Sequence, residues 1–126
     1  MRITVAKSGG YCFGVRDAVN MAYDAAEKYG EVYMLGSIVH NEKVVEDLTS
    51  AGAKIVNNLD DVPKGSPILF RAHGTIDKLW DEANSKNMNI IDATCPLVHE
   101  IHHEVKKLSE DKNELGNGRK IIIVGD

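Results

Sequence analysis

Residues 32–56, VYMLGSIVHNEKVVEDLTSAGAKIV, decide the fold class. An apolar run over 32–36 is typical of a buried strand, the spacing over 42–51 predicts a helix, and 54–56 predicts a second strand. Asn41 is placed to cap the helix at its start, and Gly52 to end it. A strand, a helix and a strand in succession form the crossover unit of a parallel sheet.

The same alternation extends along the rest of the chain. Strands are expected at 3–6, 68–72, 89–93 and 121–124. Helices are expected at 13–28, 76–86 and 96–111, the second capped by Thr75, and a loop at 60–67. The sequence therefore predicts an α/β fold with a mostly parallel sheet flanked by helices.

The composition is that of a globular protein, with 126 residues, 43% hydrophobic residues and 27% charged residues. The net charge is −4 and no basic stripe occurs, so we expect no nucleic-acid partner. No apolar run is long enough for a membrane span, and the first residues do not resemble a signal peptide. Two cysteines in such a chain are expected to be reduced thiols, which favours a cytoplasmic protein.

Both cysteines, Cys12 and Cys95, lie where an expected strand gives way to an expected helix. A thiol at the start of a helix faces unpaired N–H groups and the positive end of the helix dipole. Thiols that bind metals or attack electrophiles occur in such surroundings. The repetition of this local arrangement suggests that the two cysteines share one task.

Two histidines are expected at the same edge of the sheet as the cysteines. His40 follows the strand at 32–36 and His73 follows the strand at 68–72, and ligands of parallel sheets bind outside the carboxyl ends of strands. Each residue also has a structural explanation, because free cysteines are often buried in cores and histidines often serve packing. The four side chains would also suit zinc, although none of the spacings is the short pair of structural zinc sites.

A competing metal motif lies on the last expected helix. His99, Glu100 and His103 fit the zinc-protease pattern, which places two histidines on one helix face. Such a site needs a third ligand, and no histidine follows His103. The apolar stripe of this helix is expected to be buried and would leave both histidines toward water; it comprises Val98, Ile101, Val105 and Leu108. A solvated helix face is therefore the better interpretation.

Four segments together carry a family resemblance. They are Gly10-Tyr11-Cys12-Phe13-Gly14-Val15, Ile38-Val39-His40-Asn41, Ala72-His73-Gly74 and Asp92-Ala93-Thr94-Cys95-Pro96-Leu97-Val98. In this order and spacing, the chain resembles the 4-hydroxy-3-methylbut-2-enyl diphosphate reductases, iron–sulfur enzymes that end the non-mevalonate pathway of isoprenoid biosynthesis.

The resemblance implies an oxidoreductase in which three cysteines hold a 4Fe–4S cluster between three α/β domains. Cys12 and Cys95 match two of these ligands, and His40 and His73 match histidines that contact the substrate diphosphate. Electrons from a donor such as ferredoxin or flavodoxin would remove the substrate hydroxyl as water and yield isopentenyl and dimethylallyl diphosphate.

Two further features implied by the resemblance do not occur in these residues: a His-Pro-Glu segment, whose glutamate delivers a proton, and a third cysteine. The resemblance therefore implies that residues 1–94 form the first domain, and residues 95–126 the opening helix and strand of a second. It places no catalytic residue within the chain, and we expect these residues to be inactive alone and able to pair as a dimer through the strand at 121–124. The alternative is a small non-catalytic α/β module that binds an anion or zinc.

Overall fold

The computed structural model describes residues 1–110, 120–122 and 124. They divide into two compact units, Met1–Cys95 and Pro96–Asp126, each of which is described by itself. The boundary expected between residues 94 and 95 stays a prediction.

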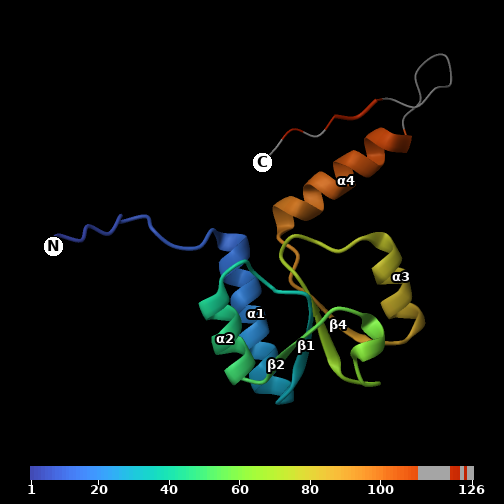
Figure 1. Cartoon of the computed structure of the whole chain (residues 1–126). Coiled ribbons are helices and arrows are strands. Elements are labelled where there is room, and N and C mark those ends of the chain that lie inside the picture. Colours follow the sequence, from blue (N-terminus) through green and yellow to red (C-terminus); the bar gives the residue numbers. More distant parts are fainter. Residues whose placement is uncertain (111–119, 123, 125–126) are drawn as a thin grey trace. The chain divides into compact units, whose positions relative to one another are not determined.

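The first unit contains a four-stranded parallel sheet with the strand order β2-β1-β3-β4 (Figure 1). Its strands are β1 (Val32–Leu35), β2 (Ala53–Val56), β3 (Pro67–Phe70) and β4 (Asn89–Asp92). Its helices are α1 (Phe13–Tyr29), α2 (Glu42–Ser50) and α3 (Asp77–Ser85), and a single 3-10 turn, η1, covers Leu59–Asp61. The expected parallel α/β fold is confirmed.

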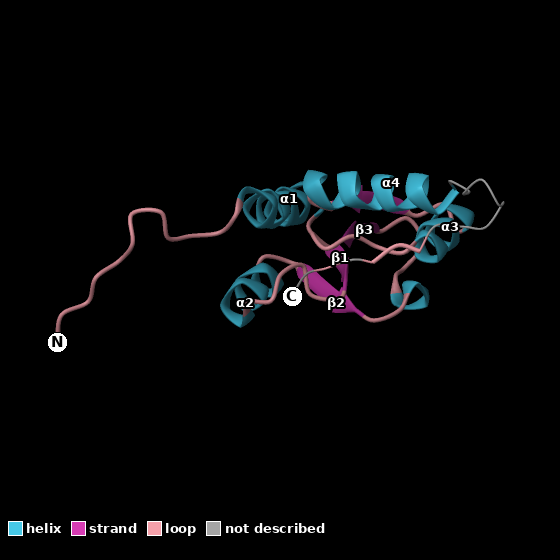
Figure 2. Ribbon diagram, turned by 90° about the horizontal axis from the view of Figure 1, so that it is seen from above, coloured by secondary structure: helices cyan, strands magenta, loops and turns pink. Residues whose placement is uncertain are grey.

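The helices cover both faces of the sheet, α1 and α2 on one side and α3 on the other (Figure 2). Alternate strand residues therefore enter two different cores. Val32, Met34 and Leu69 pack with α1 and α2, while Ile68 and Phe70 pack on the opposite face with α3 and η1. On that second face the Phe70 and Trp80 rings meet edge to face, with centroids 4.8 Å apart.

One expected strand does not form. Residues 1–12 contain no strand, and Ile3 and Val5 are 74% and 81% exposed. The residue types favour a strand, but without a neighbouring strand the backbone gains no ladder of hydrogen bonds. The described sheet thus begins at β1.

Two smaller expectations about helix caps have opposite outcomes. The Asn41 side chain caps α2 and accepts a hydrogen bond from the Val44 N–H at 3.1 Å, as predicted. The expected Thr75 cap is wrong, because the N-cap of α3 is Ile76, which makes no side-chain cap bond.

The second unit contains α4 (Pro96–Glu110). No residue of α4 is buried, so the stripe expected to be buried is not covered in this chain, and Ile101 is 54% exposed. Ile121, Ile122 and Val124 belong to no strand, and residue 123 lies outside the described residues. Within the described part of the chain, no helix is long and apolar enough to cross a bilayer.

Candidate functional site at the carboxyl edge of the sheet

The strand order creates a switch point between β1 and β3. The chain leaves β1 toward α2 on one face, and it leaves β3 toward α3 on the other face. The two strands are neighbours, with Tyr33 paired to Ile68 and Met34 to Leu69. Loops that diverge from adjacent parallel strands open a crevice at the carboxyl ends, where ligands of such folds bind.

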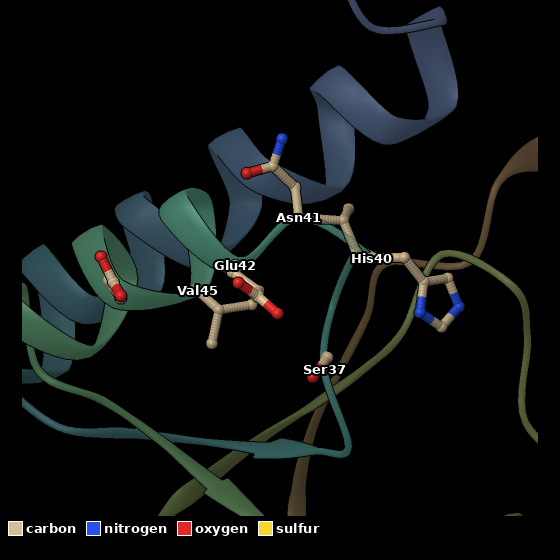
Figure 3. A pocket seen from close by; sticks show the side chains of 7 residues that line it. Ser37, His40, Asn41, Glu42 and Val45 are labelled. Atoms are coloured by element: carbon tan, nitrogen blue, oxygen red, sulfur yellow. The ribbon is translucent and has the colours of Figure 1, made fainter.

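The two candidate histidines meet at this switch point. His40 precedes the cap residue of α2, and His73 follows β3 by three residues. Their rings are stacked, with centroids 4.8 Å apart and an interplanar angle of 18°. In Figure 3 the His40 side chain projects from the loop after β1, away from Glu42 and Val45. The expectation that the two histidines lie close together is confirmed.

The surroundings of His73 favour the neutral form of its imidazole. Partial burial lowers the pKa of His73 below the usual 6.5, and the nearby His40 and Arg71 side chains lower the pKa further. The coulombic effects of these two neighbours disfavour a positive charge on His73. A bound anion would reverse this effect, because negative charge favours the imidazolium.

Two hollows lie at the carboxyl edge of the sheet, and they differ in charge. One, of about 490 Å³, is lined by His40 and Asn41 but also by the carboxylates of Glu42 and Glu46. The other, of about 270 Å³, has no acidic residue in its lining and includes Arg71; neither histidine lines it, but Gly74, the residue after His73, does. Since carboxylates repel a phosphate, the second hollow is the better place for an anion.

Arg71 is a candidate that the sequence interpretation missed. It directly follows β3, and its Nη1 atom lies 3.3 Å from the position that a Cβ on Gly36 would occupy. Gly36 has a φ of 72°, a conformation that glycine adopts without strain in the turn after β1. Its missing side chain also leaves room for the Arg71 guanidinium. Thr75 and Asn57 add polar groups to the same hollow. The signal in the sequence was a cation directly after a buried strand.

Cys95 lies at the same edge of the sheet, three residues after β4. Its N–H donates to the Ala72 carbonyl oxygen at 3.0 Å, which ties it to the loop after β3. One residue earlier, the Thr94 N–H donates to Asp92 Oδ1 at 3.0 Å and fixes the turn out of β4. The thiol is partly exposed and forms no disulfide.

Cys12 is the N-cap residue of α1, and its side chain makes no cap hydrogen bond. The helix start is near Cys95, since Gly14 in the first turn of α1 packs directly against the Cys95 side chain. The expected placement of Cys12 at a helix start is confirmed, whereas the strand expected before it is absent. The start of α1, which Cys12 caps, therefore lies against Cys95.

Cys12 and Cys95 supply two thiols and do not form a complete metal site by themselves. Among the described residues, no three His, Cys, Asp or Glu side chains are grouped to hold a metal ion. The zinc site expected as an alternative is therefore not formed by Cys12, Cys95, His40 and His73. Beside Cys95, the buried Thr94 Oγ1 has no hydrogen-bond partner, which is unusual for a buried hydroxyl.

The zinc-protease motif gains no support from the structure. His99 and His103 are exposed on α4, as the solvated-face interpretation predicts. No third ligand joins them within the described residues.

Comparison with known proteins decides the family. The profile of the family described as LytB protein matches residues 3–126. The chain belongs to the LytB family. Relatives named 4-hydroxy-3-methylbut-2-enyl diphosphate reductase include those of Geobacter sulfurreducens, 38% identical over the whole chain and 42% of the relative, and Mycobacterium sp. strain KMS, 43% identical over 98% of the chain and 36% of the relative.

Solved structures agree with this family assignment. The structure of E-1-hydroxy-2-methyl-but-2-enyl-4-diphosphate reductase from Plasmodium falciparum matches with a TM-score of 0.79 and 33% identity, over 84% of this chain and 34% of that one. A second structure, of (E)-4-hydroxy-3-methyl-but-2-enyl diphosphate reductase, matches with a TM-score of 0.73 and 32% identity over 86% of this chain and 38% of that one. The chain thus spans about two fifths of the length of these LytB relatives.

Proposed function

We propose that these residues are the N-terminal part of a 4-hydroxy-3-methylbut-2-enyl diphosphate reductase. The complete protein would reductively remove the substrate hydroxyl and release isopentenyl and dimethylallyl diphosphate. The observation that carries the proposal is the convergence of His40, His73 and Cys95 at one edge of the sheet, in a chain that matches the family along almost its whole length.

In this proposal the histidine pair binds the diphosphate. Stacked imidazoles present N–H donors to the crevice between β1 and β3, and Arg71 adds a permanent positive charge nearby. The first turn of α2, whose N-cap follows His40, contributes the positive end of a helix dipole. The lowered pKa of His73 favours its neutral form before binding, and a bound anion would raise that pKa.

Cys12 and Cys95 would each bind one iron of a 4Fe–4S cluster. Bound there, the cluster would supply the electrons that replace the substrate hydroxyl. The chain contributes the spacing of the two thiols and, through Thr94 Oγ1, a buried donor beside one of them. Hydrogen bonds near the sulfurs are among the features that set the potential of such clusters.

Several further features follow from the proposal. The protein would act in the cytoplasm and accept electrons from a ferredoxin or a flavodoxin. Residues 1–126 alone would not turn over substrate, because their two cysteines leave irons without protein ligands. The apolar residues exposed on α4, together with Ile122 and Val124, would pair with another chain or another domain.

Anaerobic reconstitution with ferrous iron and sulfide tests the cluster site. The chain should bind iron and sulfide and show the visible sulfur-to-iron absorption band. Cys12→Ser and Cys95→Ser should each lower bound iron and sulfide severalfold, while His103→Ala, on the exposed face of α4, should leave them unchanged.

The competing zinc-binding module predicts a different outcome. That module would bind zinc in preference to iron and sulfide, develop no visible band, and lose zinc when either His40 or Cys95 is replaced. Equal iron and sulfide in the wild-type chain and both serine variants would contradict the cluster proposal.

A further inference from the structure

Gly14 lies closer to Cys95 than any residue with a side chain could. It is buried in the first turn of α1. A Cβ at this position would be 2.5 Å from the Cys95 Sγ and 2.9 Å from the Cys95 Cβ. Both distances are under 3.0 Å, a separation that real Cβ atoms essentially never show.

The backbone conformation does not explain this glycine. Gly14 is inside α1 and is not among the glycines with positive φ, so an L-residue could adopt its conformation. Glycine is a poorer helix former than alanine, so helix propensity alone would favour alanine here. The space beside Cys95 is therefore the feature that requires glycine.

We infer that Gly14 is a positioning residue that sets the separation of the two thiols. Its missing side chain lets the first turn of α1 pack against Cys95. Cys12 lies only two residues away, which limits its Cα to about 7.6 Å from the Gly14 Cα, at 3.80 Å per residue. A methyl group at position 14 pushes the start of α1, and Cys12 with it, away from Cys95. The purpose of this spacing rests on the proposed cluster site, but the spacing itself does not.

Cross-linking of the reduced, metal-free chain tests the spacing directly. Dibromobimane becomes fluorescent when it bridges two nearby thiols, and the wild-type chain should form the Cys12–Cys95 bridge. Gly14→Ala should lower the yield of the bridge at least fivefold under conditions where the variant is fully folded. Ala26→Gly is the matched control, because it weakens the other end of α1 and leaves the first turn intact.

A double-mutant cycle shows whether the contact with Cys95 is the cause. Gly14→Ala should lower the folding equilibrium constant at least tenfold, even though alanine has a higher helix propensity than glycine. The same substitution in a Cys95→Ala background should cost clearly less, because the nearest clashing atom, Sγ, is gone. Absence of bridging in the wild-type chain, unchanged bridging in Gly14→Ala, or a cost independent of Cys95 would each overturn the inference.

The outcome is separable from that of the proposed function. A chain that bridges its thiols through Gly14 but binds no iron and sulfide would retain the inference and refute the cluster. A chain that binds iron and sulfide equally well with Gly14→Ala would refute the inference and retain the cluster.

Discussion

Replacing Asn41 by alanine should loosen the loop that presents His40. The Asn41 side chain accepts from the Val44 N–H at 3.1 Å and satisfies one of the otherwise unpaired donors at the start of α2. It also fixes the backbone at φ −140° and ψ 107°, one residue after His40. Loss of this bond frees the first turn of α2 and, with it, the imidazole.

The expected cost is about 1 kcal/mol, the usual value for an N-cap replaced by alanine. The cap is exposed, so its donor can turn to water and a larger loss is not expected. In a compact unit of the size of Met1–Cys95, that cost lowers Tm by about 4–8 °C. Thermal unfolding followed by circular dichroism measures the shift, and pyrophosphate titration measures the accompanying loss of affinity.

Asn41→Ser is the control, since a serine hydroxyl can accept the same bond. It should retain most of the stability and most of the affinity. Equal losses in the alanine and serine variants would refute the reasoning, because the cap would then not be the interaction that matters.

Four further predictions follow from the structure. His40→Ala should raise the pKa of His73, measured by NMR titration of the imidazole, because it removes both cover and a neighbouring positive charge. In the wild-type chain, the lowered pKa of His73 means that its contribution to stability is present above pH 6.5 and is lost as the pH falls below that value. Urea unfolding between pH 5 and pH 8 measures this loss. A midpoint that does not change with pH, or a pH dependence that His73→Gln leaves unchanged, would contradict the prediction. Phe70→Leu should cost about 2 kcal/mol, from lost volume and a lost aromatic pair, and shift the emission of the chain's single tryptophan; an unshifted emission would argue against the pair. Gly52→Ala should destabilise more than Gly65→Ala in urea unfolding, because both have positive φ but only the first adds a clash with a main-chain carbonyl; equal costs would show that strain alone acts.

The sheet and its helices could be predicted because their signals are local. Apolar runs with glycines at or near their ends, such as 32–36 and 68–72, lie within a residue or two of the observed strands. The Asn41 cap was predictable for the same reason, since its partner is three residues away. Strand order was not, because pairing of β1 with both β2 and β3 joins distant segments.

The two larger failures share one physical cause, which is that an apolar pattern forms a buried element only against a partner. Residues 3–6 and the stripe of α4 have the composition of buried elements, but Ile3 and Ile101 are 74% and 54% exposed. A strand pattern predicts what a segment would do beside another strand, and it cannot tell whether that strand is present.

The candidate site was predictable in its residues but not in its geometry. The sequence predicted that His40 and His73 lie at one edge of the sheet, and their rings do meet there. The switch point between β1 and β3 depends on the strand order, which the sequence did not reveal. Arg71 was missed because exposed cations often follow strands, and only the structure shows that this one lines a hollow. The contact of Gly14 with Cys95 joins residues 81 positions apart, so no local pattern contains it.

The central claim is that the loops after β1 and β3 form an anion site around the histidine pair. Titration of the chain with inorganic pyrophosphate, followed by imidazole resonances in NMR, tests it most directly. The resonances of His40 and His73 should shift together and saturate with one Kd, and the pKa of His73 should rise in the bound state. The resonances of His102, exposed on α4, should not move. Shifts of equal size at His102, or none at His40 and His73, would contradict the account.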